Sequence, residues 1–301
     1  MWFILALCAV LAWSGSDLFS KIGSKPDDKQ SHWKMVVAVG AVMGIHALYT
    51  ILTSGENYQF ESFLKYLPVS ALYILSMIFG YAGLRYIALS ISSPICNSSG
   101  ALVSLLCFVF LKQSMAAWQI VAVIAICAGV FLLALVEKRQ DNQLKAAMKD
   151  TSNTKYIRSA KALIFPLIYL VLDALGTFFD AFYLDGDTPI LSEFQANTSY
   201  ELTFLVMGVF AAIYVFAIKK EKISLKNDSF KLTAAVCETA GQFAYVYALA
   251  DNAIVAAPMI ASYSAISLLW ARLFLKEKLS KWHYLCLALV FIGIIILGVL
   301  E

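Results

Sequence analysis

Three acidic residues, Asp173, Asp180 and Glu238, lie inside long apolar stretches of the sequence. Thr177 and Asp180 follow Asp173 at i+4 and i+7, so a helix would place all three on one face, with Gly176 beside them. Ionisable groups at membrane depth are energetically costly and usually face a cavity or a partner. The pattern indicates a cation or proton site facing a central cavity. The alternative is a structural hydrogen bond to a neighbouring helix.

Glu238 begins a second polar stripe. Gln242 and Tyr245 follow it at i+4 and i+7 and share its helix face. A carboxylate, an amide and a phenol in line could hold an amine and its apolar body. Alternatively, Glu238 pairs with a basic group such as Arg272.

Polar residues also interrupt the first apolar segment. Trp13 and Ser16 share a face at i+3 and are candidates for a cavity wall. Asp17 has two interpretations, a site residue or a carboxylate that neutralises Lys21.

Two further polar residues are candidates for binding or coupling. Asn97 shares a face with Ala101 and Ser104, where it lines a cavity or joins neighbouring helices by hydrogen bonds. His46 is a group that could titrate near neutral pH. The alternative role for His46 is a hydrogen bond between two helices.

Other spacings favour helix packing. Gly40 and Gly44 form a GxxxG pair, which allows close approach of helices. Tyr263 and Trp270 share a face at i+7, either as packing residues or as an aromatic wall for a cation.

Composition identifies the solvent of these segments as lipid. Of the 301 residues, 61% are hydrophobic and only 14% are charged. A soluble protein of this length could not bury so much apolar surface. The six cysteines lie in apolar runs without a CxxC pair, which predicts neither a disulfide framework nor a metal site. The first apolar run has no charged leader or cleavage pattern, so we expect a retained helix.

Ten segments are long enough to cross a bilayer, which needs about 20 apolar residues per helix. They are 2–20, 33–53, 63–84, 87–110, 116–136, 160–183, 198–218, 232–250, 253–273 and 281–300. The polar stretch 137–159 divides the chain into a first five-helix unit, 1–136, a linker, and a second five-helix unit, 160–301.

The basic residues support ten crossings. If successive loops alternate sides, 21 of the 23 lysines and arginines fall on one side, and only Lys65 and Lys112 fall on the other. Loops rich in lysine and arginine remain cytoplasmic. The charge bias therefore predicts a multi-pass protein of the cytoplasmic membrane with both termini outside.

The sequence also repeats internally. Residues 94–137 align without a gap onto 258–301, and this alignment matches prolines, tryptophans and glycines in register. The matched pairs include Pro94 with Pro258, Trp118 with Trp282 and Gly129 with Gly293. An odd number of helices in each unit predicts two copies of opposite orientation, a plan that recurs in secondary transporters.

These motifs resemble those of the EamA-type branch of the drug/metabolite transporter superfamily. An L-G-E-x-L type turn of that family is similar to the segments 275–279 (LKEKL) and 111–115 (LKQSM), the latter lacking the acid. Residues 13–16 (WSGS) are similar to a W-G-S-like stretch of that family. Gly176-Thr177 is the corresponding stretch in the second half. The resemblance implies an all-α membrane protein of ten helices in two repeats, and export of small solutes.

The sequence contains no P-loop, HExxH or GxSxG motif, so we expect neither a cofactor nor ATP-driven pumping within this chain. The leading hypothesis is a secondary transporter of a small organic metabolite or drug-like solute, and the buried acids favour an organic cation, an amino compound or proton coupling. An intramembrane enzyme acting on a lipid-linked substrate and a non-transporting scaffold are the alternatives. We expect a solute and the lipid bilayer as partners, no nucleic acid, and a monomer or homodimer.

Overall fold

The computed structural model describes residues 1–24, 28–87, 89–147, 160–184, 189–277 and 279–300, and every regular element in these ranges is helical. The first part contains α1 (Trp2–Gly23), α2 (Ser31–Thr53), α3 (Phe60–Leu84), α4 (Leu89–Cys96), α5 (Ser99–Leu106), the π-helical turn Cys107–Leu111 and α6 (Ala117–Ala147). The second contains the 3₁₀ turn Ala160–Leu163, α7 (Ile164–Leu184), α8 (Glu193–Ile213), the π-helical turn Tyr214–Ile218, α9 (Leu225–Ala261), α10 (Tyr263–Phe274) and α11 (Lys281–Leu300).

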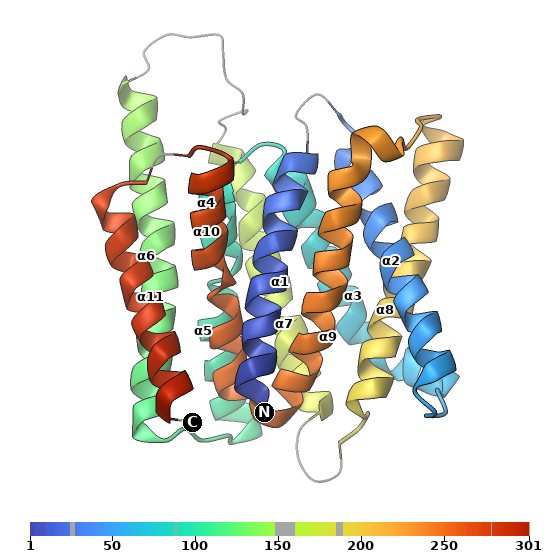
Figure 1. The fold of residues 1–301 in the computed structure, drawn as a ribbon, viewed down its shortest axis with the longest axis horizontal. Helices are drawn as coiled ribbons and strands as arrows, with labels where there is room; N and C mark the ends of the chain where they lie inside the picture. Colours follow the sequence, from blue (N-terminus) through green and yellow to red (C-terminus); the bar gives the residue numbers. More distant parts are fainter. Residues whose placement is uncertain (25–27, 88, 148–159, 185–188, 278, 301) are drawn as a thin grey trace.

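The helices run side by side, and the principal packing pairs join the first part of the chain to the second (Figure 1). The main pairs are α1 with α9, α2 with α8, α3 with α7 and α6 with α11. The chain therefore places two series of helices around a shared centre. The start of α1 and the end of α11 lie at the same end of the molecule (Figure 1).

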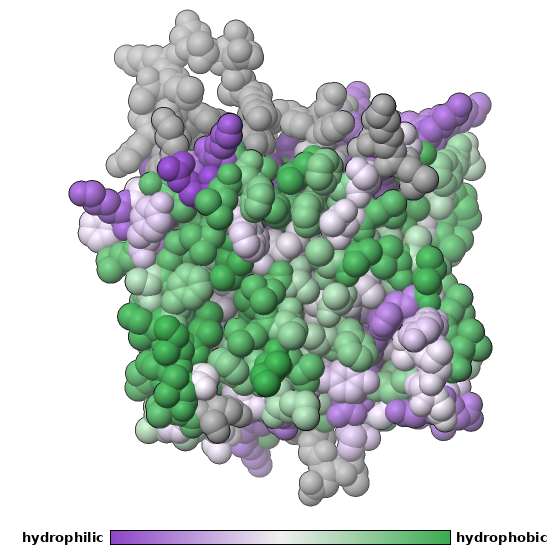
Figure 2. All heavy atoms as spheres, viewed as in Figure 1, coloured by the Kyte–Doolittle hydropathy of each residue, from purple (hydrophilic) through white to green (hydrophobic). Residues whose placement is uncertain are grey.

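The outer surface carries a broad apolar band, with hydrophilic residues gathered toward its two ends (Figure 2). Large apolar side chains exposed on the surface include Leu48, Phe108, Ile124, Phe210 and Ile292. Within the described ranges, nine helical segments are long and apolar enough to cross a membrane. The chain is therefore an all-α integral membrane protein.

One of these nine segments, Asp228–Phe274, has 47 residues. At about 1.5 Å per residue a straight helix of that length would extend about 70 Å, more than twice the hydrocarbon thickness. The helix is not straight, because Asn252 has non-helical dihedral angles (φ −157°, ψ 76°) and divides α9. This residue lies in the two-residue gap, 251–252, between the predicted membrane segments 232–250 and 253–273.

The single helix predicted over 87–110 is instead two helices, α4 and α5, separated at Asn97 and Ser98. Pro94 lies inside α4, where it lacks the amide hydrogen that a continuous helix would use. Ser98 (φ −66°, ψ −7°) has nearly the same dihedral angles as Ser262 (φ −67°, ψ −7°), which separates α9 from α10. These two serines are matched by the internal repeat of the sequence.

A second pair of repeated positions also shares its backbone conformation. Lys112 and Lys276 have φ of 54° and 56°, in the left-handed region, and each follows the end of a membrane segment.

The end of the fifth predicted segment differs from the prediction. The helix α6 continues to Ala147, beyond the expected end at 136. The added residues are rich in lysine, glutamine and alanine, which favour helix. The predicted linker residues 148–159 lie outside the described ranges.

Candidate functional site

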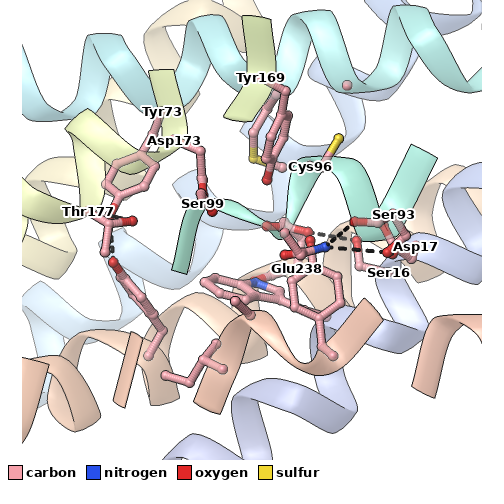
Figure 3. A pocket seen from close by; sticks show the side chains of 18 of the residues that line it. Ser16, Asp17, Tyr73, Ser93, Cys96, Ser99, Tyr169, Asp173, Thr177 and Glu238 are labelled. Carbon is pink, nitrogen blue, oxygen red and sulfur yellow. Dashed lines mark hydrogen bonds between the residues drawn. The ribbon is translucent and has the colours of Figure 1, made fainter. Parts of the chain in front are cut away.

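A cavity of about 80 Å³ lies at the centre of the helices. Side chains from α1, α3, α4, α5, α7, α8, α9 and α10 line it, so both parts of the chain contribute (Figure 3). One water molecule needs roughly 10–15 Å³ of such space. The cavity therefore has room for several waters or a small solute.

Three carboxylates face this cavity, and serine hydroxyls from other helices bind each of them. Ser16 on α1 donates to Glu238 on α9 at 2.7 Å. Ser99 on α5 donates to Asp173 on α7 at 2.7 Å. These bonds fix the direction of both carboxylates while leaving them beside the cavity.

Asp17, on α1, is the third carboxylate. It accepts hydrogen bonds from Ser93 of α4 and from Ser267 of α10, the latter at 2.7 Å. In Figure 3 the three acids follow one another across the cavity in the order Asp173, Glu238, Asp17. The site therefore concentrates acid groups that come from three different helices.

The described residues that line the cavity include no lysine, arginine or histidine. Serine hydroxyls can satisfy carboxylate oxygens but do not neutralise a charge. A buried charge is stable only when it is paired, and otherwise the group is neutralised by a proton. The cavity is therefore suited to receive a cation or protons.

The break between α4 and α5 positions two of the serine donors. Asn97 donates from its amide to the carbonyl of Ser93 at 2.9 Å and so stabilises the end of α4. Because α5 starts afresh at Ser99, this residue reaches Asp173 across the helix interface. The break converts a membrane helix into a support for two different carboxylates.

Aromatic rings form another wall of the cavity. The Trp13 ring lies 5.0 Å from that of Tyr245 and 5.8 Å from that of Tyr263, measured between centroids. Its indole nitrogen donates to the carbonyl of Glu238 at 3.3 Å. A Cβ at Gly241 would lie 2.3 Å from the Trp13 ring, so glycine at 241 makes room for this tryptophan.

Hydroxyl groups close the cavity toward the end that holds the start of α1. Tyr73 donates to Thr177 at 3.0 Å, and its oxygen lies 2.6 Å from that of Tyr245. Tyr66 donates to Asp180 at 2.6 Å in the same region. We call these five residues the tyrosine layer.

The structure brings together most of the residues singled out from the sequence. The cavity is lined by Trp13, Ser16, Asn97, Asp173, Thr177, Glu238, Gln242 and Tyr245. Asp180 shares the predicted face of α7, but it is bound by Tyr66 in the tyrosine layer and does not line the cavity.

His46 lies elsewhere, between α2 and α8. Its Nδ1 is 2.8 Å and 2.9 Å from the two carboxylate oxygens of Glu201, and Asn197 donates to the same carboxylate at 3.0 Å. His46 therefore forms a hydrogen bond between helices, which was the alternative interpretation in the sequence analysis. His46 is not a lining residue of the cavity.

Asp17 is a site residue that the sequence left undecided. The structure places it in the cavity, where Ser93 and Ser267 donate to it, and Lys21 donates to the carbonyls of Leu84 and Ile87. Its spacing of i+4 from Trp13 was a usable signal, because that spacing places both on one helix face.

Glu238 does not pair with Arg272, which was the alternative partner suggested by the sequence. Arg272 donates to the carbonyl of Glu277, and Ser16 is the partner of Glu238. Of the two α10 residues that the sequence placed on one face, Tyr263 lines the cavity and Trp270 donates to the hydroxyl of Ser14 at 3.1 Å.

Tyrosines of the cavity wall were missed by the sequence analysis. Tyr73, Tyr81, Tyr169 and Tyr200 line the cavity from α3, α7 and α8. In sequence they are ordinary aromatic residues of apolar segments, and only tertiary packing distinguishes them from tyrosines that face lipid. Among the described residues, no group of three or more histidine, cysteine or acidic side chains is arranged to hold a metal.

Comparison with known proteins relates the chain to transporters. A sequence profile of the EamA-like transporter family matches residues 1–135 and 188–299. No curated protein shows significant similarity. One solved structure, described only as "Crystal structure of protein", is 11% identical, with a TM-score of 0.66 over 99% of this chain and 96% of that one. At this identity the match supports the fold alone.

Proposed function

Because the chain belongs to the EamA-like transporter family, we propose that it is a secondary transporter of a small organic solute. Family membership makes it a membrane transporter rather than an enzyme. The proposal adds a mechanism of alternating access at the central cavity, and a solute of cationic or amino character.

One observation carries the proposal: the cavity between the two series of helices is lined by Asp17, Asp173 and Glu238, and its described lining residues include no lysine, arginine or histidine. A scaffold would gain nothing from three acids at membrane depth, where each is costly to bury. A lipid-modifying enzyme would need reactive groups gathered at one point, whereas these carboxylates are tied to separate serines. A transporter that binds cations or protons gives these acids a function.

We propose ten crossings arranged as two inverted five-helix units, 1–136 and 160–301, joined by the segment 137–159, whose first residues extend α6 to Ala147. The length of Asp228–Phe274 and the non-helical Asn252 support two crossings in that segment. Matched backbone geometry at Ser98 and Ser262 supports the repeat, as does the left-handed pair Lys112 and Lys276.

We place the protein in the cytoplasmic membrane with both termini outside, because the basic residues concentrate on the opposite side. In this orientation the tyrosine layer lies toward the outside. The cavity residues Ser20 and Leu84, near the ends of α1 and α3, lie toward the cytoplasm.

Exchange between proton and substrate is the simplest coupling that the cavity supports. A carboxylate such as Asp173 that binds either a proton or a cationic group lets each displace the other. The empty carrier would then return protonated, and it would load substrate when the proton leaves.

Solute flux tests the proposal. Proteoliposomes are filled with a defined mixture of amines, amino acids and nucleosides, and mass spectrometry identifies what leaves. We expect saturable loss of one class, at least about ten-fold slower through Glu238→Gln, because a hydrogen bond to a charged group contributes about 1.5–3 kcal/mol. Glu61→Gln, an exposed acid on α3, is the matched control. Loss no faster than from protein-free liposomes would refute transport.

A further inference from the structure

We propose that the cavity binds a linear organic cation with two or more ammonium groups, that is, a diamine or polyamine. This inference deepens the proposed function, since it names the substrate class of the same cavity. It rests on the number of acids, on their arrangement, and on two buried polar groups that have no partner.

The number of acids exceeds what a single cation needs. Asp17, Glu238 and Asp173 line one cavity, and the described lining residues contribute no positive charge. A ligand with one ammonium would pair with one carboxylate and leave two buried acids without a counter-charge. A ligand with several ammonium groups pairs with two or three of them.

The arrangement favours an extended ligand. The three carboxylates do not converge on one point, since no group of three acidic, histidine or cysteine side chains among the described residues is arranged to hold a metal. Each accepts a hydrogen bond from a serine of a different helix: Ser99 of α5, Ser16 of α1 and Ser93 of α4. Figure 3 shows Asp173 and Asp17 on opposite sides of the view, with Glu238 between them. A chain with charges along its length matches a row of acids, whereas a compact dication such as a metal ion needs converging ligands.

Two buried polar groups point to a ligand independently of the acids. The Tyr81 hydroxyl and the Gln242 amide nitrogen have no hydrogen-bond partner, although these residues are only 5% and 1% exposed and both line the cavity. Buried polar groups normally have a partner. The phenol oxygen can accept from an ammonium. The amide can present its oxygen instead after rotation about its last torsion.

The aromatic wall suits the rest of such a ligand. Methylene groups between ammonium centres can lie against the ring of Trp13 and the two rings that it contacts, those of Tyr245 and Tyr263. Ring faces also attract ammonium groups directly. Solutes with a net negative charge are disfavoured by the same three carboxylates.

Binding of defined amines tests this inference. The full-length protein in lipid nanodiscs is titrated at constant ionic strength with spermidine, putrescine and n-butylamine. We expect spermidine to bind at least about ten-fold more tightly than n-butylamine, since one further charge-assisted hydrogen bond contributes about 1.5–3 kcal/mol. Equal affinity for spermidine and n-butylamine, or no binding of either, would overturn the inference.

Single substitutions test whether the ligand contacts all three carboxylates or only one of them. Asp17→Asn, Asp173→Asn and Glu238→Gln should each weaken spermidine binding at least about ten-fold, whereas n-butylamine should respond strongly to one of them at most. Glu61→Gln should change neither affinity. Tyr81→Phe gives a second measurement that leaves every buried acid in place, and we expect it to weaken spermidine binding about three- to ten-fold. Unchanged spermidine affinity in folded Asp17→Asn and in Tyr81→Phe would overturn the inference.

Flux distinguishes the failure of this inference from the failure of transport. If another solute crosses saturably and spermidine neither binds nor competes, the polyamine assignment is wrong and the transporter stands. If spermidine binds with the variant pattern above but no solute crosses, the proposed cation site is supported and the proposed transport function is wrong.

Discussion

The hydroxyl oxygens of Tyr73 and Tyr245 lie 2.6 Å apart and join α3 to α9 at the end of the central cavity that lies nearer the start of α1. Tyr73 also donates to Thr177 of α7. A phenol has one hydrogen to donate, so Tyr245 is the donor in the bond between the two tyrosines. One hydroxyl group thus connects three helices, two of which belong to the second part of the chain.

Removal of this hydroxyl should weaken closure of the tyrosine layer. In a variant that keeps Cys96, a cavity residue, as its only cysteine, we expect Tyr73→Phe to speed labelling from the side of the termini about five-fold. A hydrogen bond contributes about 1 kcal/mol net, which corresponds to roughly that factor. The measurement is the rate of reaction with a membrane-impermeant thiol reagent added to one side of sealed vesicles.

The matched control for this experiment is Tyr49→Phe, because Tyr49 lies on the outer surface of α2 and is 64% exposed. It should leave the labelling rate unchanged. An equal rate in Tyr73→Phe and the parent would show that the layer does not limit access to the cavity.

Asp173→Asn should abolish or uncouple transport without unfolding the protein. The amide keeps the shape of the side chain and its contact with Ser99, but it can neither carry a charge nor exchange a proton. We expect at least about a ten-fold slower flux in proteoliposomes, because a charge-assisted hydrogen bond is lost. Normal flux that still responds to a pH gradient would remove Asp173 from the mechanism, and Glu61→Gln is the control.

The sequence predicted the membrane class and much of the site because periodicity and buried charge are local signals. Asp173, Thr177, Glu238 and Gln242 were found because polar groups in an apolar helix stand out and share a face. Tyr73 was not found, since a tyrosine is compatible with lipid, with packing and with a cavity. Which of these holds depends on neighbouring helices and not on spacing.

Helix breaks were harder to predict than helices. Pro94 marked an irregular point, but the separation of α4 from α5 also depends on Asn97 and on contacts with α7. The turn of the L-G-E-x-L type shows why the family pattern uses glycine. The corresponding Lys112 and Lys276 have positive φ, a conformation that glycine adopts without strain.

The orientation can be tested at two loops of the first unit. In a cysteine-free background, Glu56→Cys after α2 should react with an impermeant maleimide added to intact cells, whereas Lys29→Cys before α2 should react only after the cells are opened. This follows from the basic side being cytoplasmic. The reverse pattern would invert the proposed topology, and it would place the tyrosine layer on the cytoplasmic side.

Close packing of α2 against α8 depends on two glycines. A Cβ at Gly40 would lie 2.5 Å from the carbonyl oxygen of Phe204 and 2.8 Å from Cα of Gly208, both backbone atoms. Gly40→Ala should therefore destabilise the protein by about 1–3 kcal/mol, the usual cost of overpacking. Gly15→Ala is the control, because its Cβ would meet only the Cys237 side chain at 3.3 Å. Equal unfolding midpoints for the two variants would contradict this account.

The pair of His46 and Glu201 should stabilise the same interface through a buried charge. Glu201 is fully buried, while the His46 side chain is one third exposed. In His46→Ala the Glu201 carboxylate would keep its hydrogen bond from Asn197 but lose its contact with the imidazole, so we expect the protein to be less stable by about 1–3 kcal/mol.

Glu201→Gln removes the charge that His46 balances, which makes the double variant the decisive measurement. His46→Ala combined with Glu201→Gln should be about 1–2 kcal/mol more stable than the sum of the single effects predicts, as for residues in one hydrogen-bonded pair. His46→Ala combined with the distant Glu61→Gln should be additive. Additivity in both combinations, measured by reversible unfolding in mixed micelles, would show that the contact between His46 and Glu201 contributes nothing to the packing of α2 on α8.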